Sequence, residues 1–192
     1  GIATVEKNML EAAQRRGEEV TFLPTTIEGG KARKLATAIV AYAGYLRGLK
    51  SCDLVHVHMA SRGSYLRKKA FIAAAASHKK PVLLHLHGSE FAMWYDEECT
   101  EGQRRDICQT FRLCSRIVVL SEEWRDFLLK RRICDIEQVK VLHNAVDIPG
   151  ENVTDYTSNT VLFMGRLDKR KSPDVLLRAA ARALSTHPDA RF

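Results

Sequence analysis

The sequence predicts an α/β protein built on a doubly wound parallel sheet. Segments with helical and with strand-like patterning alternate along the 192 residues, as they do in βαβ units. Several strand-like segments are almost continuously apolar, which is typical of strands covered by helices on both faces. The clearest are "LVHV", "PVLL", "RIVVL" and "TVLFM".

The first third of the chain predicts two helices around a short strand. Apolar residues recur at helical spacing over residues 5–13, and Gly17 ends the pattern. A strand is expected over residues 19–23. After a polar loop, an apolar stripe over residues 35–49 predicts the second helix.

The middle of the chain repeats the strand and helix alternation. Ser121 is expected to cap the helix that starts there, because Glu122 and Glu123 favour its first turn. The pattern predicts strands over 52–58, 81–87, 116–120 and 138–143, helices over 65–77, 104–113 and 122–132, and a loop over 88–102.

The sequence predicts two domains of unequal size. Residues 1–145 are expected to form a Rossmann-like domain that lacks its first strand, and residues 146–159 a polar linker. Residues 160–192 supply a strand over 160–165 and a helix from Ser172 to about residue 186, the opening βα unit of a second domain.

Composition narrows the possible partners. The net charge of +7 favours an anionic partner, but RNA-binding signatures are missing, so nucleic acid is not expected. The five cysteines show no CxxC spacing, which indicates reduced thiols in a cytoplasmic protein. No apolar run approaches the roughly 20 residues of a membrane-spanning helix.

The stretch "GRLDKRKSP", residues 165–173, is suited to holding a phosphorylated ligand. Gly165 permits a tight turn. Arg166 and Lys171 supply charge. Ser172 and Pro173 are expected as N-cap and first residue of a helix, whose free N–H groups suit phosphate. An ordinary basic turn that binds nothing is the alternative from local physics.

Two His-x-His patterns lie at the ends of neighbouring predicted strands. His56 and His58 share one face of their strand, as do His85 and His87. A four-histidine metal site is one reading, weakened because no acidic or cysteine ligand completes it. The other reading makes His56 and His85 buried, hydrogen-bonded core residues. His87 is predicted to be functional, because ligands bind at the carboxyl ends of parallel strands.

Two further segments leave alternatives open. The stretch "GSEFAMWYDEECTEG" is either a substrate loop or, preferably, an exposed acidic loop anchored by Trp94 and Tyr95. The stretch "HNAVD" is either an Asx-type turn made by Asn144 and Asp147 or a hinge lining an interdomain cleft.

Taken in order, six stretches resemble the family-4 retaining glycosyltransferases of the GT-B fold. They are the opening "GI", "DLVHVH", "HLHGSE", "RIVVLSEEW", "VLHNAVD" and "LFMGRLDKRKSPDVLLRAA". The resemblance implies two Rossmann-like domains, the first holding the acceptor and the second the nucleotide-sugar. Ser172 departs from it by standing where the family usually has Gly, and the acidic E-x7-E element is expected beyond Phe192.

The resemblance also implies roles for individual residues. Arg166 and Lys171 contact the donor diphosphate, with Gly165 in the same turn. Gly1 is the last residue of a glycine-rich loop near that phosphate. His87 is the catalytic candidate and lies near the donor sugar. The interdomain segment contains Asn144 and Asp147.

The implied activity is that of a hexosyltransferase acting with a nucleotide diphosphate-sugar donor, without cofactor or metal. The acceptor would be a carbohydrate or a lipid-linked molecule, in polysaccharide or glycolipid synthesis at the inner face of the plasma membrane. Lys68, Lys69, Lys79 and Lys80 are candidates for contacts with anionic lipid. A non-catalytic module that binds a phosphorylated ligand, and a GT-B epimerase or phosphorylase, are the alternatives.

Overall fold

The structure is a computed structural model of the 192-residue chain. It describes residues 2–25, 27, 30–145, 150, 155, 157–165, 167–169 and 171–192. The chain divides into two compact units, Gly1–Val146 and Asp147–Phe192, and each is considered by itself.

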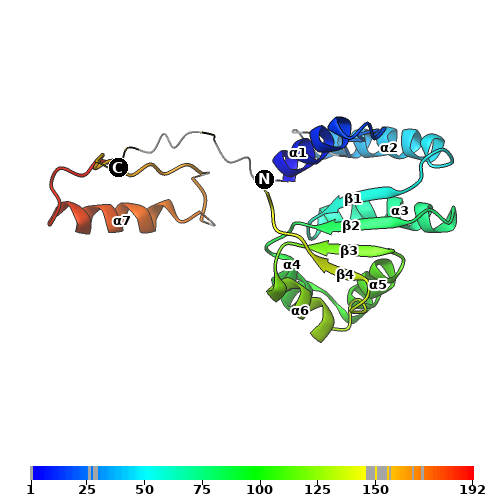
Figure 1. Cartoon of the computed structure of the whole chain (residues 1–192). Coiled ribbons are helices and arrows are strands. Elements are labelled where there is room, and N and C mark those ends of the chain that lie inside the picture. The colour runs from blue at the N-terminus through cyan, green and yellow to red at the C-terminus, as the bar shows by residue number, and fades with distance from the viewer. Residues whose placement is uncertain are drawn as a thin grey trace. The chain divides into compact units, whose positions relative to one another are not determined.

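The first unit is built on a four-stranded parallel sheet, which confirms the predicted fold class (Figure 1). The strands follow one another in chain order across the sheet, and the register places His58 beside His85. The strands are β1 (Val55–Met59), β2 (Val82–Leu86), β3 (Arg116–Val119) and β4 (Val139–Val141).

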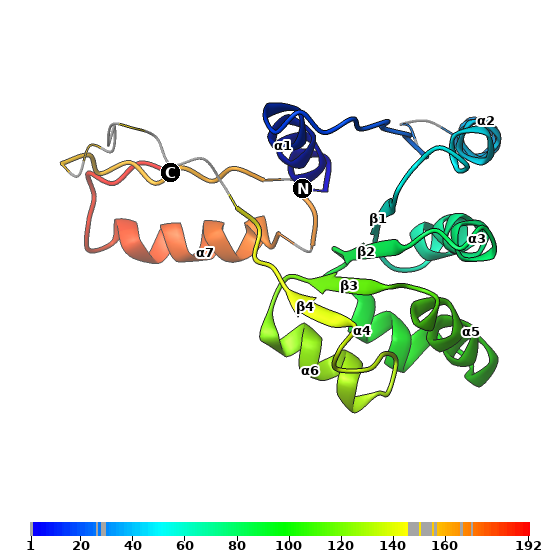
Figure 2. The same ribbon diagram turned by 45° about the vertical axis from the view of Figure 1, so that its right-hand side comes forward.

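Helices connect the strands, as the sequence predicts. The helices α3 and α5 contact each other and lie side by side along the sheet (Figure 2). Ser121 caps α6 as expected, because its hydroxyl accepts a hydrogen bond from the Trp124 N–H at 3.3 Å. The helices of this unit are α1 (Ile2–Arg15), α2 (Lys31–Gly48), α3 (Gly63–Ser77), the single turn α4 (Phe91–Met93), the π-helix η1 (Trp94–Glu98), α5 (Glu101–Arg112) and α6 (Glu122–Lys130).

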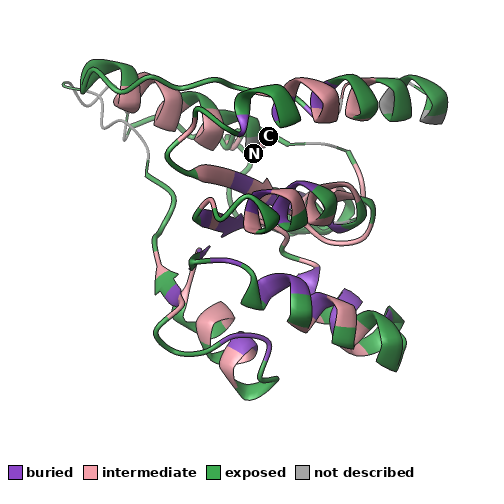
Figure 3. Cartoon of the chain, turned by 90° about the vertical axis from the view of Figure 1, so that its right-hand side faces the viewer, coloured by how far each residue is buried: buried purple, intermediate pink, exposed green. Residues whose placement is uncertain are grey.

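The core lies between the sheet and its helices (Figure 3). Val57 and Met59 on β1 and Leu84 and Leu86 on β2 are all buried. Each such side chain contributes about 1.5–3 kcal/mol when it leaves water. Because side chains alternate along a strand, these four point away from the face that carries the histidines.

The strand predicted over residues 19–23 is wrong, since residues 18–25 have no regular structure. Val20 and Phe22 are 48% and 51% exposed. Among the described residues, β1 is an edge strand of the sheet. An extended segment that finds no ladder partner gains no strand hydrogen bonds, whatever its β propensity.

The loop predicted over residues 88–102 is also wrong, because it contains α4, η1 and the start of α5. Trp94 and Tyr95 are buried, which confirms that they anchor the segment. Thr100 and Gln103 form a capping box that begins α5. The S/T-x-x-E/Q pattern was the available signal for this helix start.

The second unit contains α7 (Pro173–Leu184) and one parallel bridge between Thr160 and Arg191. The strand predicted over residues 160–165 is wrong beyond Thr160, since residues 161–164 are irregular. Leu162 and Met164 are 82% and 90% exposed. A single pair of short extended segments is marginal in water, because burial on a larger sheet normally stabilises such strands.

Candidate functional site

The carboxyl ends of β1 and β2 are joined by a backbone hydrogen bond, in which the His87 N–H donates to the Met59 carbonyl at 2.8 Å. Within the turn after β1, the Ala60 N–H donates to the Ser64 hydroxyl at 3.0 Å. The sequence placed His58 and His87 last in their strands. In the structure β1 continues to Met59, and His87 follows β2 by one residue. The side chain of His87 therefore belongs to a turn fixed at its backbone.

Four imidazoles form a continuous cluster on one face of β1 and β2. The rings of His85 and His87 have centroids 4.0 Å apart, and those of His56 and His58 are 4.3 Å apart. Between the strands, the His58 and His85 centroids are 5.1 Å apart. The Nδ1 atom of His58 lies 2.8 Å from the Nε2 atom of His87, a hydrogen bond whose donor depends on the tautomers.

Burial keeps this cluster uncharged. Desolvation lowers the pKa of His58 to about 3, and that of His85 and of His87 to about 4, with neighbouring imidazoles adding to the effect. Desolvation also lowers the pKa of His56. At neutral pH each ring therefore offers one N–H donor and one acceptor nitrogen. Such a group can orient a hydroxyl but carries no charge.

The expectation that His56 and His85 are buried, hydrogen-bonded core residues is right only for the burial of His85, because His56 is partly exposed and the buried ring nitrogens have no hydrogen bond. His85 is 2% exposed, yet neither of its ring nitrogens has a hydrogen-bond partner. The Nε2 atom of His56 is buried without a partner as well. Both rings lie against other imidazoles on this sheet face, with centroids 4.0–5.7 Å apart.

Gly88 makes the close approach of the two strand ends possible. A Cβ atom at this position would lie 3.1 Å from both the Ala60 Cα atom and the Ser61 backbone nitrogen. Both neighbours are backbone atoms, which cannot rotate away as a side chain can. The sequence predicts Gly88 only at the start of a loop, whereas the structure shows that the packing requires a residue without a side chain.

An ion-pair network beside this turn was not predicted. Arg62 binds Glu90 and Glu98, with its Nε donating to Glu98 at 2.9 Å. The pairing lowers the pKa of the Glu98 carboxyl and raises the pKa of Arg62. Arg62 also has a φ of 52°, a conformation that non-glycine residues rarely adopt. Its partners lie 28 and 36 residues away, so no local pattern signals them.

The segment after β4 ends at the same edge of the sheet. The Nδ1 atom of His143 lies 2.9 Å from the Leu120 carbonyl oxygen. Asn144 follows, exposed, so that it lies at the edge that also carries His87. Asp147 lies outside the described residues, and the turn predicted for it with Asn144 stays a prediction.

The predicted phosphate turn is described only in part, because Arg166 lies outside the described residues, as does Gly1. A Cβ atom at Gly165 would lie 3.8 Å from the Lys171 Cγ atom, so these two residues are close. The Lys171 N–H donates to the Asp168 carbonyl at 3.0 Å. The loop therefore closes on itself as a turn before α7.

Ser172 does not cap α7 with its side chain, which corrects the prediction. Its φ and ψ are 49° and 51°, the left-handed region in which glycine is favoured. Its hydroxyl donates to the Lys169 carbonyl at 3.1 Å instead. Pro173 begins the helix as predicted. The Ser172 backbone carbonyl, and not its hydroxyl, accepts a hydrogen bond from the Val175 N–H at 3.0 Å.

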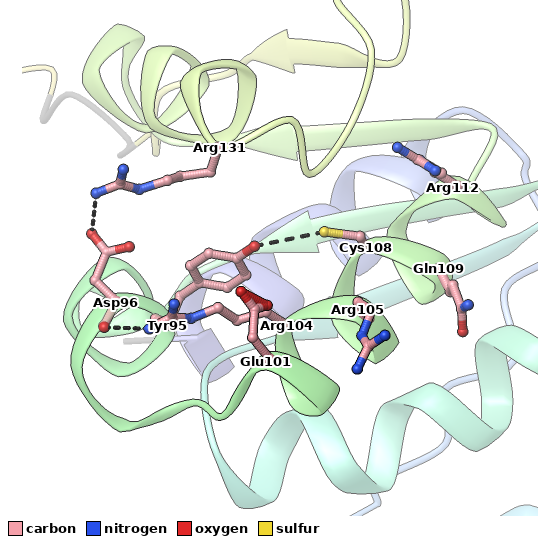
Figure 4. A pocket seen from close by; sticks show the side chains of 9 residues that line it. All are labelled: Tyr95, Asp96, Glu101, Arg104, Arg105, Cys108, Gln109, Arg112 and Arg131. Atoms are coloured by element: carbon pink, nitrogen blue, oxygen red, sulfur yellow. Dashed lines mark hydrogen bonds and ion pairs between the residues drawn. The ribbon is translucent and has the colours of Figure 1, made fainter.

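A hollow of about 620 Å³ on the first unit is lined by residues of η1, α5 and the end of α6, and none of them is a histidine (Figure 4). Two of the arginines that line it are bonded to other residues of the protein. Arg104 donates to the carbonyls of Tyr95 and Asp96, and Arg131 pairs with the Asp96 carboxylate at 2.8 Å. These contacts tie η1 to α5 and to the end of α6. The hollow is therefore an open surface formed by a structural network.

Comparison with known proteins decides the family. The family model for Glycosyltransferase Family 4 matches residues 1–148. The chain belongs to glycosyltransferase family 4. A curated relative of this family-4 chain is the D-inositol 3-phosphate glycosyltransferase of Corynebacterium kroppenstedtii, 25% identical over 198 positions. The alignment covers 88% of this chain and 42% of the relative, so the chain spans less than half the relative's length.

No solved structure matches the family-4 chain. None of the helices in its described residues has the length and apolar character needed to cross a bilayer. The match includes His87, Gly88 and Asn144, so the strand-end site lies within the part of the chain that defines the family.

Proposed function

We propose that the protein to which this chain belongs is a retaining glycosyltransferase. It moves a hexosyl group from a nucleotide diphosphate-sugar to an acceptor hydroxyl. The observation that carries the proposal is the family match over residues 1–148 together with His87 at the carboxyl edge of its parallel sheet. That edge is where open α/β sheets bind ligands. Because the chain belongs to a family of transferases, this activity is favoured over an epimerase, a phosphorylase or a non-catalytic binding module.

The donor diphosphate is proposed to bind at the turn before α7. Breaking the glycosidic bond leaves negative charge on the diphosphate, and fixed positive groups stabilise that charge where it develops. Lys171 and Arg166 would supply cations, while Gly165 lets the backbone approach. Gly1 is proposed beside the same phosphates. Lys171 and Gly165 are neighbours in the turn, which supports the proposal. No metal ion is needed for this step.

His87 is proposed to contact the donor sugar. Burial lowers its pKa to about 4, so the neutral ring would bind a sugar hydroxyl as donor or acceptor. Its Nε2 atom is engaged with His58, which leaves Nδ1 for the substrate. Asn144 and Asp147 are proposed to line the cleft between domains.

The acceptor is proposed to be a carbohydrate, a phosphorylated polyol or a lipid-linked molecule. The phosphorylated polyol follows the name of the relative. We further propose that the enzyme works in the cytoplasm, at the membrane surface where lipid-linked acceptors lie, and the net charge of +7 supports this. Two lysines of the proposed lipid patch are engaged, because Lys69 pairs with Asp106 and Lys80 donates to the carbonyls of Lys50 and Cys52.

A donor screen tests the proposed function. The full-length protein is incubated with a panel of nucleotide-sugars and candidate acceptors, in parallel buffers with and without a metal chelator. Release of nucleoside diphosphate identifies the donor, and the anomeric proton coupling of the product reports its configuration. Acceptor-dependent release with retained configuration supports the proposal. Inverted configuration, or no release with any donor, refutes it.

A further inference from the structure

Three histidines on β1 and β2 present their ring nitrogens to one another. One nitrogen from each of His56, His58 and His85 lies within 4.8 Å of the other two. Their spacing follows from the sheet: His56 and His58 are two residues apart on one strand, and His85 is the register partner of His58 on the next. The Cβ positions of all three residues are therefore set by strand backbone, and no loop residue contributes to the cluster.

Several deeply buried ring nitrogens of this cluster have no hydrogen-bond partner. His85 is 2% exposed, and both of its ring nitrogens are buried without a partner. The Nε2 atom of His56 is also buried without a hydrogen-bond partner. Most buried polar atoms in proteins are hydrogen-bonded, so each exception needs an explanation such as an ion that binds there.

We propose that His56, His58 and His85 form a site for a divalent transition metal of the zinc class. Imidazole is a preferred ligand for such ions, and three histidines with a water molecule complete a tetrahedral shell. The cluster contains only histidines, which disfavours Mg²⁺ and Ca²⁺ because those ions prefer oxygen ligands. The five cysteines are free, and none of them belongs to the cluster.

Metal binding requires only a modest closure of the rings. Zinc–nitrogen bonds of about 2.0–2.1 Å place tetrahedral ligands roughly 3.3 Å apart, whereas the three nitrogens lie within 4.8 Å of one another. Rotation of the imidazoles about their side-chain bonds covers that difference, because terminal torsions of histidine are broad.

His87 is the outer partner of this site. Its Nε2 atom lies 2.8 Å from the Nδ1 atom of His58, and metal-bound histidines usually donate their second N–H to a neighbouring acceptor. A metal on the Nε2 atom of His58 would place the proton on its Nδ1 atom. His87 would then accept at Nε2 and carry its own proton on Nδ1. Metal loading thus sets the tautomer of the proposed sugar-binding residue, a consequence that rests on the proposed function.

The binding test needs no enzymatic activity. The metal-free chain is titrated with Zn²⁺ by calorimetry and with Co²⁺ by absorption spectroscopy. We expect one ion per chain, the strong visible bands of tetrahedral cobalt, and no thiolate charge-transfer band. Mg²⁺ should give no heat. Absence of stoichiometric Zn²⁺ binding overturns the proposal, and so does a thiolate band that assigns the ion to cysteines.

Variants locate the ion. His56→Ala and His85→Ala should each weaken Zn²⁺ binding about 100-fold or more, and His87→Ala about tenfold, as expected for an outer partner. His78 is exposed and lies outside the cluster, so His78→Ala serves as the matched control. Unchanged binding in His56→Ala and His85→Ala contradicts the site.

Circular dichroism checks that the variants fold. If His85→Ala is unfolded, His56→Ala decides, because His56 is only partly buried. As a second readout, Zn²⁺ should raise the Tm of the wild-type chain by mass action and leave that of folded His56→Ala nearly unchanged. An equal rise in both proteins overturns the assignment.

Discussion

The Nδ1 atom of His58 lies 2.8 Å from the Nε2 atom of His87. This bond joins β1 to the residue that follows β2, at the carboxyl edge of the sheet. Because both rings are neutral, one nitrogen must donate and the other accept. The tautomer of His87 therefore depends on a residue 29 positions away.

His58→Phe tests this dependence in the full-length enzyme. The substitution keeps an aromatic ring and removes the hydrogen bond, so His87 loses its fixed tautomer. We expect kcat/KM to fall about tenfold, the equivalent of one lost hydrogen bond. Steady-state kinetics measures the effect, and His78→Phe is the matched control. If His58→Phe folds normally and has unchanged kcat/KM, His58 does not position His87.

Arg166→Ala and Lys171→Ala test the proposed diphosphate site. Each removes a cation that stabilises the leaving group, so kcat/KM of the full-length enzyme should fall at least about tenfold, at roughly 1.4 kcal/mol per decade. Lys169→Ala removes an exposed charge from the same turn and should have little effect. Steady-state kinetics in which all three variants retain wild-type turnover would remove these residues from the site.

Gly88→Ala tests the close approach of the two strand ends. The added Cβ atom would lie 3.1 Å from backbone atoms of Ala60 and Ser61, and overpacking of this kind costs about 1–3 kcal/mol of unfolding free energy. Gly44→Ala is the control, because its Cβ atom meets nothing within 4 Å and alanine stabilises a helix by about 0.5–1 kcal/mol. Urea denaturation should move the two midpoints in opposite directions. Equal midpoints would show that the turn accommodates the added Cβ atom without a measurable loss of stability.

The histidine cluster predicts loss of stability in acid for the metal-free chain. The unfolded histidines titrate near pH 6.5, whereas the folded pKa is about 3 for His58 and about 4 for His85 and His87. Between these values the unfolded state binds more protons, so stability falls as the pH is lowered. The positive charge of Lys68 also opposes protonation of His58.

Urea denaturation in a chelator-containing buffer measures this effect. We expect the unfolding free energy to be lower at pH 5 than at pH 7 by about 2 kcal/mol or more. His56→Leu should reduce the difference, because one titrating group leaves the cluster, while His78→Ala should retain it. Identical stability at the two pH values would mean that the rings protonate freely in the folded state.

Periodicity was sufficient to predict most elements of the first unit. The apolar runs of β1 to β3 and the helical stripe of α3 reflect burial against the core. The stripe of α2 predicted that helix correctly, although Leu35, Ile39 and Leu46 are exposed. The segments over 19–23 and 162–165 have the same local preference but form no strand, because a strand also needs a neighbour. Trp94 and Tyr95 were recognised as anchors, yet the short helices that carry them were not.

The α/β class and the family-4 resemblance could be predicted from consecutive residues, because apolar spacing and motifs are local; His87 as a site residue stays a prediction from the same motifs. The bond between His58 and His87, the pairing of Arg62 with Glu90 and Glu98, and the packing of Gly88 on the Ala60 backbone are visible only in the folded chain. These contacts join residues 28 to 36 positions apart. Strand register sets such distances, and register arises from the packing of the whole sheet.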